Sequence, residues 1–289
     1  MYISNVIVII FYLLDLVAAF AVTGPVGCLF VAVALPIVIW IQEKLCILES
    51  NAIKLDDLNL SDQDTLRSMF DTVLEAAEKN GFYFHGKNPK IYLVESDEPN
   101  AFNCGNSIVI NRGILDSPYR NGVTVHEIKH WKFHDSYCSM LISSTVYVFF
   151  LMLMFLLGAS ITFIVVFVSI IFGIIFGSTL GFIAGSIIGR ILNFLKKIIT
   201  NTLYYVIKFL ETALSRFTEY KADEFAAICS FTYDVIRFLE SIKDQDLLYS
   251  SLAERVLSTH PTCQKRINRL KKIEKQLEYN ETLSLLFDV

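Results

Sequence analysis

The sequence predicts a mainly α-helical membrane protein in which four transmembrane helices, arranged as two hairpins, carry one α+β domain. Three observations support this fold class. Of the 289 residues, 54% are hydrophobic and 19% are charged, whereas about a quarter of the residues in an ordinary soluble domain are charged. The excess apolar residues are concentrated in two blocks. The remaining polar sequence combines helical periodicity with short runs rich in β-branched residues.

The first apolar block, residues 1–42, predicts an N-terminal helical hairpin. Asp15 is the only charged residue in this block. The first apolar stretch, residues 3–22, is about 20 residues long, which is the length that a transmembrane helix needs. Thr-Gly-Pro at 23–25 interrupts it before a second run at 26–41. A cleaved signal peptide is the alternative, but no basic segment precedes the apolar core. A charged Asp15 would cost about 3 kcal/mol at mid-membrane, so we expect it to face other helices or to be protonated.

The first part of the α+β domain is predicted at residues 43–138. Apolar residues recur at helical spacing in 62–79, which indicates an amphipathic helix. Two β-prone runs at 91–94 and 107–110 are bounded by Pro, Asn and Gly and indicate strands. The stretch 121–137 is expected to be helical.

The second apolar block predicts another hairpin, which we place at residues 139–190. Residues 136–189 contain no Asp, Glu, Lys, Arg or His. As one helix they would extend about 80 Å, far beyond a hydrocarbon core of about 30 Å, so the chain must fold back. Gly-Ala-Ser at 158–160 is the expected turn, which gives spans near 139–157 and 163–189.

Five glycines at four-residue spacing predict that the last span packs closely against a neighbouring helix. They are Gly173, Gly177, Gly181, Gly185 and Gly189. The second part of the α+β domain then occupies 191–289, with helices expected at 202–229 and 263–279.

The distribution of charge predicts a cell-membrane protein whose polar domain lies in the cytoplasm. The turns of the expected hairpins carry no Lys or Arg, and the positive-inside rule assigns the basic flanks to the cytoplasm. Those flanks carry Lys44, Lys129, Lys132, Arg190, Lys196 and Lys197. A net charge of −4 indicates no nucleic-acid partner. The six scattered cysteines form no CxxC pair, which argues against a disulfide scaffold and a cysteine zinc site.

His126-Glu-Ile-Lys-His130 is an HExxH motif. On a helix the two histidines share one face, so both imidazoles can reach one metal ion. Glu127 can reach a metal-bound water as general base. Two surface histidines on a charged helix are the alternative interpretation of this motif alone.

A catalytic zinc ion needs a third protein ligand. The metzincin pattern would place a histidine at Ser136, so it fails, and a further helical turn would tilt His134 away from the pair. Glu219 on a later helix is the stronger candidate, and Asp223, one turn on, could accept the N–H of a ligating imidazole. The alternative interpretation is that Glu219 and Asp223 simply lie on the solvent-exposed face of a helix. Glu219 and His130 can share a metal only if the chain crosses the membrane an even number of times between them, which the expected second hairpin provides.

The order and spacing of these segments resemble the HtpX-type membrane zinc metallopeptidases, which are gluzincins related to the CAAX prenyl proteases. The resemblance covers nearly the whole chain, including both expected hairpins. Its sequence segments are PNAF at 99–102, HEIKHWKFHD at 126–135, SRFTEYKADEFAA at 215–227 and THPTCQKRI at 259–267.

The resemblance implies a gluzincin-like α+β domain that binds one zinc ion per subunit. The implied zinc ligands are His126, His130 and Glu219. Glu127 would be the general base. His260 would stabilise the oxyanion of the tetrahedral intermediate, the alternative being a structural role in capping a helix or in packing. Asp223 would orient a ligating histidine, and Asp135 would have a structural role beside the site. Asn100 and Ala101 would lie beside an extended substrate on an edge strand, a turn-forming Asn100 being the alternative.

Three residues depart from the pattern of the family. Lys129 replaces the usual glycine of the HExxH motif, and we expect it to point away from the metal. Asn103 and Cys104 replace the usual small residues of the substrate loop.

The implied activity is zinc-dependent endopeptidase cleavage of polypeptides by metal-activated water, in quality control of damaged or misfolded membrane proteins. The partners would be such polypeptides and the lipid bilayer. A membrane-anchored zinc-binding module that holds clients without cutting them is one alternative, and a CAAX-type processing protease is another. A metal transporter is disfavoured, because the second apolar block has no charged residue or histidine.

Overall fold

The computed structural model describes residues 24–84, 88–244 and 260–287. It also describes five residues of the N-terminal segment, namely Tyr12, Leu13, Leu16, Val17 and Ala19. Most of the first expected span, including Asp15, lies outside the described residues. The chain divides into two compact units, one built mainly from residues 36–140 and 212–289 and the other from 7–35 and 141–211.

A four-stranded mixed sheet lies in the first unit, with the strand order β1-β2-β4-β3. Its strands are β1 (Ile53–Lys54), β2 (Lys90–Val94), β3 (Ala101–Cys104) and β4 (Ser107–Asn111). β2 and β4 are parallel, whereas β1 pairs antiparallel with β2 and β3 pairs antiparallel with β4. The strands expected at 91–94 and 107–110 are therefore confirmed, and β3 forms an edge of the sheet.

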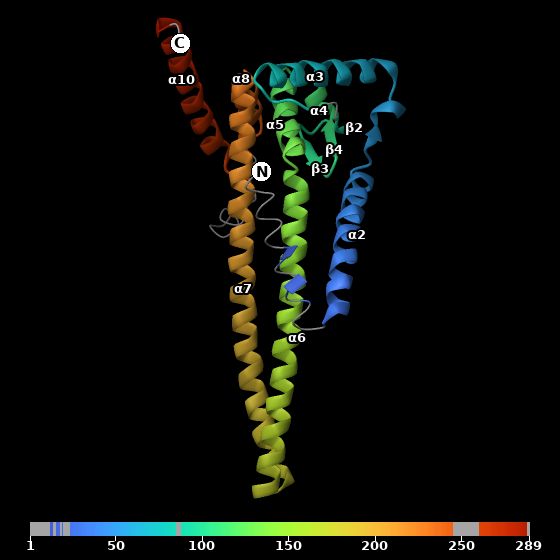
Figure 1. The fold of residues 1–289 in the computed structure, drawn as a ribbon, viewed down its shortest axis with the longest axis vertical. Helices are drawn as coiled ribbons and strands as arrows, with labels where there is room; N and C mark the ends of the chain where they lie inside the picture. The colour runs from blue at the N-terminus through green and yellow to red at the C-terminus, as the bar shows by residue number, and fades with distance from the viewer. Residues whose placement is uncertain are drawn as a thin grey trace. The chain divides into compact units, whose positions relative to one another are not determined.

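Helices form the core together with this sheet, and α5 packs against β3 and β4 (Figure 1). They include α3 (Leu60–Lys79), α4 (Arg112–Leu115), α5 (Arg120–Lys132), α8 (Thr232–Ser241) and α10 (Cys263–Phe287), and η1 (Leu55–Asp57) is a short 3₁₀ turn. Leu66 and Val73 of α3, Ile108 and Ile110 of β4, and Ile128 of α5 are fully buried. α5 is buried along ten consecutive residues, from Gly122 to Trp131. The polar side chains of α5 consequently lie inside the protein, where each of them needs a partner.

The second apolar block forms parts of two long helices, α6 (Asp135–Phe176) and α7 (Ser178–Ile228). The turn expected at 158–160 is wrong, because α6 continues through these residues. The chain turns at Gly177, whose φ is +92°. Small residues do not end a helix by themselves, whereas a glycine in the left-handed region does. By length and composition, Met152–Phe176 and Ser178–Ile228 are candidate membrane spans.

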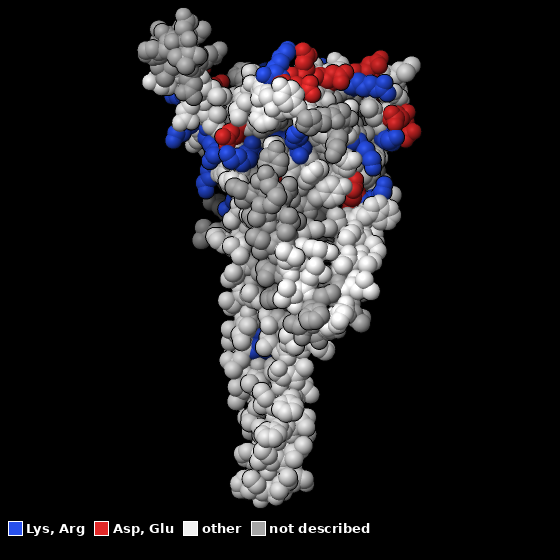
Figure 2. Space-filling view, in the orientation of Figure 1, with Lys and Arg blue, Asp and Glu red and all other residues white. Residues whose placement is uncertain are grey.

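The exposed side chains of α6 and α7 in the second unit are largely apolar. Phe163, Phe167 and Ile174 of α6 and Phe182 and Phe194 of α7 are each more than half exposed. Figure 2 shows these helices as an almost uncharged surface, while acidic and basic side chains gather over the sheet and its helices. Large exposed apolar patches are rare on soluble proteins, so this surface suits contact with lipid.

The close packing predicted from the five periodic glycines is confirmed for three of them, which pack against α6, whereas Gly173 lies on α6 itself and Gly177 forms the turn. A Cβ atom on Gly181 would lie 2.4 Å from the carbonyl oxygen of Ser169, and one on Gly185 would lie 1.9 Å from the Ser169 hydroxyl. A Cβ atom on Gly189 would lie 3.2 Å from Val165. At Gly181 the two helices therefore approach too closely for any larger residue, because the nearest atoms belong to the backbone. At Gly185 the nearest atom is a hydroxyl that can rotate, and the backbone oxygen of Val165 follows at 3.2 Å.

Replacing Gly181 with alanine should destabilise the protein by about 1–3 kcal/mol, because the new methyl group meets backbone atoms that cannot move aside. The matched control is Gly158→Ala, whose nearest neighbour is the Lys196 amine at 3.5 Å. The control should stabilise α6 by up to about 1 kcal/mol, the difference in helix propensity. Thermal unfolding in detergent measures both variants, and an equal rise in Tm would contradict the packing argument.

Candidate metal centre

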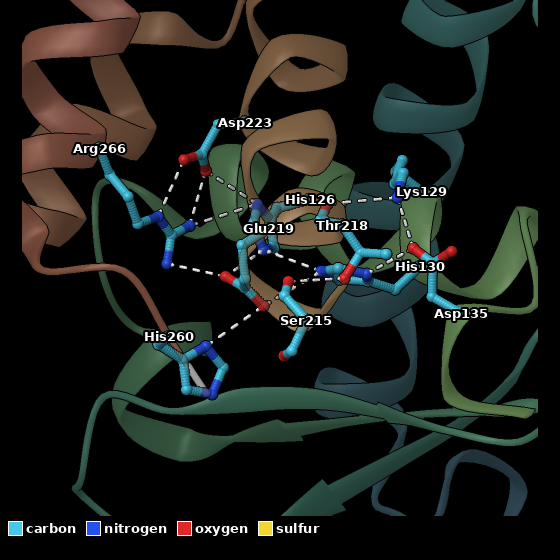
Figure 3. A network of polar contacts seen from close by, with 10 residues as sticks. All are labelled: His126, Lys129, His130, Asp135, Ser215, Thr218, Glu219, Asp223, His260 and Arg266. Carbon is cyan, nitrogen blue, oxygen red and sulfur yellow. Dashed lines mark hydrogen bonds and ion pairs between the residues drawn. The ribbon is translucent and has the colours of Figure 1, made fainter. Parts of the chain in front are cut away.

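α5 carries the HExxH motif into the core and presents both histidines on one face. The side chains of His126 and His130 are 9% and 11% exposed, so these are not the surface histidines of the alternative interpretation. Their Nε2 atoms lie 3.2 Å apart. The two imidazoles thus point at the same small volume (Figure 3).

α7 brings Glu219 to the same place, although 88 residues of chain separate it from His130. Its Oε2 lies 3.5 Å from His126 Nε2, and its Oε1 lies 3.6 Å from His130 Nε2. Ligands bound at about 2.1 Å in tetrahedral geometry are about 3.4 Å apart. Each carboxylate oxygen of Glu219 lies at about this distance from one of the two imidazoles, and one ligand atom from each of the three residues lies within 4.8 Å of the other two. His126, His130 and Glu219 could therefore hold a zinc ion. His134 lies outside this group, and its ring instead contacts Tyr137.

The other nitrogen of each imidazole faces a carboxylate. Asp223 Oδ1 lies 3.1 Å from His126 Nδ1, and Asp135 Oδ2 lies 2.8 Å from His130 Nδ1. A carboxylate in this position holds the proton on Nδ1, so the lone pair of Nε2 is free to bind a metal. The structure therefore places Asp223 and Asp135 in equivalent positions behind the two histidines.

Arg266 of α10 also belongs to this network, although it was not among the site residues predicted from the sequence. Its guanidinium contacts both oxygens of Asp223, at 2.8 and 2.6 Å, and Oε2 of Glu219 at 3.0 Å. A signal was present in the sequence, because Arg266 lies on the apolar face of its helix with Cys263, Ile267 and Leu270. All four side chains are buried. A buried arginine requires anionic partners, and here it finds two.

Lys129 is buried as well, and its amine contacts the same Asp135 oxygen as His130. It also donates to the carbonyl oxygen of Thr218 at 3.3 Å. This lysine thus connects α5 to the residue that precedes Glu219. The departure from the usual glycine therefore adds a contact behind the histidines instead of an exposed charge.

The buried charges of the centre leave a negative excess. Its four acids are Glu127, Asp135, Glu219 and Asp223, and its two cations are Lys129 and Arg266. With neutral histidines and ionised acids, two negative charges remain. A divalent cation would neutralise them, which agrees with the ligand set.

The two glutamates have opposite pKa shifts. Burial raises the pKa of Glu127, and the nearby histidines only partly offset this effect. Burial would also raise the pKa of Glu219, but Arg266 and hydrogen bonds from the histidines hold that pKa well below its usual range. Glu219 therefore stays ionised, as a ligand must, whereas Glu127 accepts a proton more readily than an ordinary glutamate.

The remaining predicted site residues lie at two further places. His260 Nδ1 is 3.2 Å from Glu219 Oε1, and its side chain is 64% exposed, so it occupies the open side of the centre. Asn100 precedes β3 and its carbonyl accepts the Asn111 N–H at 3.0 Å, while Ala101 begins the strand. The structure places these two residues at an edge of the sheet.

Comparison with known proteins finds a family, a relative and a solved structure to which the chain is similar. Residues 63–274 match the model of Peptidase family M48. The protein named "Protease HtpX homolog" from Aquifex aeolicus (strain VF5) is 27% identical, and the match covers 65% of this chain and 67% of that protein. The crystal structure of S. mikatae Ste24p matches with a TM-score of 0.46 and 19% identity, over 90% of this chain and 66% of that chain. The present chain thus spans about two thirds of the length of each. The family match contains every residue of the metal centre.

Proposed function

The chain belongs to peptidase family M48, and we propose that it is a membrane-integrated zinc endopeptidase. The observation that carries this proposal is the buried triangle of His126, His130 and Glu219, with Glu127 beside it. The presence of Glu127 favours a catalytic site over a site that merely binds zinc, because it is a buried carboxylate next to a ligating histidine but outside the group of three ligands, and a purely structural site has no use for a proton acceptor.

In the proposed mechanism, His126, His130 and Glu219 hold the zinc ion. When bound there, the ion would supply Lewis-acid chemistry, polarising a carbonyl and lowering the pKa of a water molecule. Glu127 takes the proton of the attacking water and later passes it to the leaving amine. Asp223 and Asp135 keep the two imidazoles oriented during these steps. His260, on the open side, would donate to the oxygen that becomes negative.

We propose that an extended polypeptide substrate pairs with β3. Among the described strands β3 pairs with β4 alone, and its opposite edge is where an extended substrate would add as a further strand. Asn100 and Ala101, at the start of β3, would contact the substrate first.

The proposed setting is quality control of damaged membrane proteins at the cytoplasmic side of the cell membrane. Two features support a membrane setting for the centre. Glu219 lies on α7, the same continuous helix as a candidate span, and α6 begins three residues after α5 ends. The cytoplasmic assignment depends on the basic flanks noted in the sequence.

The decisive experiment is cleavage of fluorescein-labelled casein by the full chain purified in detergent. We expect 1,10-phenanthroline to abolish cleavage and added Zn²⁺ to restore it, because chelation removes the ion that the three ligands share. A zinc-loaded, folded protein that cleaves neither casein nor a denatured membrane protein would overturn the peptidase proposal in favour of a client-binding module. Cleavage that persists in the chelator would exclude zinc.

A further inference from the structure

Glu43 is a buried carboxylate near the end of α2 (Pro25–Glu49), and it is 6% exposed. It accepts hydrogen bonds from the Asn106 N–H at 3.3 Å, the Ser107 hydroxyl at 3.4 Å and the Tyr137 hydroxyl at 2.9 Å. The first two donors lie at the turn between β3 and β4, and the third lies on α6. One side chain therefore joins α2 to the sheet and to α6.

The turn between β3 and β4 packs directly against the side chain of Glu43. Gly105 has a φ of +61°, and a Cβ atom on it would lie 2.6 Å from Glu43 Cδ. The Gly105 N–H donates to the Ser136 hydroxyl at 2.7 Å, and the Trp131 indole N–H donates to Asn106 Oδ1 at 2.9 Å. Three helices, α2, α5 and α6, thus hold the two residues of this turn.

Cys104, the last residue of β3, also contacts Glu43. Its side chain is almost fully buried, and its sulfur lies 4.0 Å from the carbonyl oxygen of Glu43. β3 has four residues and, among the described strands, one neighbour. The position of so short an edge strand depends on its ends, and Glu43 holds the end opposite to Asn100.

We propose that Glu43 is a positioning residue for substrate. It fixes the β3–β4 turn to the end of α2, so that the edge of β3 opposite to β4 is presented in one register to an extended peptide. This inference depends on the proposed function, since it assigns β3 to substrate pairing. A carboxylate suits the task because its two oxygens can accept from several donors at once, whereas a glutamine offers one oxygen and brings two donors of its own.

The first test compares Glu43→Gln with Glu49→Gln, an exposed glutamate on the same helix. For fluorescein-labelled casein we expect KM to rise about tenfold in Glu43→Gln, the loss typical of a hydrogen bond to a charged group. The kcat and the zinc affinity should be unchanged, and Glu49→Gln should match the wild type. An unchanged KM, or a fall in kcat and zinc affinity without a rise in KM, would overturn the inference.

The second test needs no activity. Hydrogen–deuterium exchange should show about tenfold faster exchange at residues 101–107 in Glu43→Gln, and a smaller increase in Tyr137→Phe, which removes one of the three donors. Exchange in α5 should stay as in the wild type. If the wild type proves inactive, the proposed function fails while this result still decides whether Glu43 holds the strand. Unchanged exchange at 101–107 would refute that role.

Discussion

Replacing Glu127 with glutamine should leave zinc bound and reduce peptide hydrolysis by about 10²–10⁴-fold, the contribution of a positioned general base. The amide has nearly the shape of the carboxyl group but cannot accept the proton of the attacking water. The side chain is 7% exposed and burial raises its pKa, so a neutral group is tolerated at this position. The expected result is therefore a folded, metal-loaded and inactive protein.

Metal analysis of the purified variant measures whether zinc stays bound. Initial rates on labelled casein measure the loss of peptide hydrolysis. Glu78→Gln is a suitable control, because Glu78 is an exposed glutamate of α3, outside the metal centre. The control should match the wild type in both measurements. Turnover at the wild-type rate in Glu127→Gln would disprove the general-base assignment. Loss of zinc from this variant would instead show that Glu127 is a ligand.

The features that the sequence predicted well are those encoded by local spacing. His126 and His130 share a helix face because they are four residues apart, and this holds in any fold. Glu219 was found through the chemical need for a third ligand, and Asp223 through its spacing from Glu219. The strands at 91–94 and 107–110 are confirmed because a run of β-branched residues in the core has few alternatives to a strand.

The features that it missed depend on contacts between distant segments. The turn at Gly177 was misplaced because the apolar block contains several glycines at which the chain could turn. The choice among them depends on how α7 packs on α6 at Gly181 and Gly185, which the sequence does not reveal. β3 is short, contains Asn103 and has no marked pattern of its own, so an edge strand at Asn100 and Ala101 was implied only by the family resemblance. The contacts next to its ends come from Glu43 and Asn111, which are distant in sequence or belong to the neighbouring strand. Lys129 and Arg266 are charged residues whose burial follows from partners on other helices.

Replacing Glu219 with alanine should lower zinc affinity by at least about 100-fold. Loss of an outer partner of a ligand typically costs 10–100-fold, and loss of the ligand itself should cost no less. Two effects act in the same direction here. The ion loses one of three protein ligands, and the buried site loses one of the two negative charges that a divalent cation would neutralise.

The fold should survive this change, which makes the measurement interpretable. Arg266 contacts Glu219 at 3.0 Å, but it keeps both hydrogen bonds to Asp223 when Glu219 is removed. The guanidinium therefore does not become an unpaired buried charge, the situation that costs several kcal/mol. Zinc affinity can be measured by competition with a chromophoric chelator, and an unchanged melting temperature without metal would confirm the intact fold.

His134→Ala is the matched control, because His134 is the rival third ligand that sequence spacing left open. The structure places its ring beside Tyr137, 6.0 Å between centroids, and outside the group formed by the other two histidines and Glu219. Its removal should therefore leave zinc affinity unchanged. If zinc affinity fell in His134→Ala and held in Glu219→Ala, the ligand assignment would be reversed. α7 would then have no part in binding the ion, and the apparent convergence of the two helices on one metal would be a packing contact.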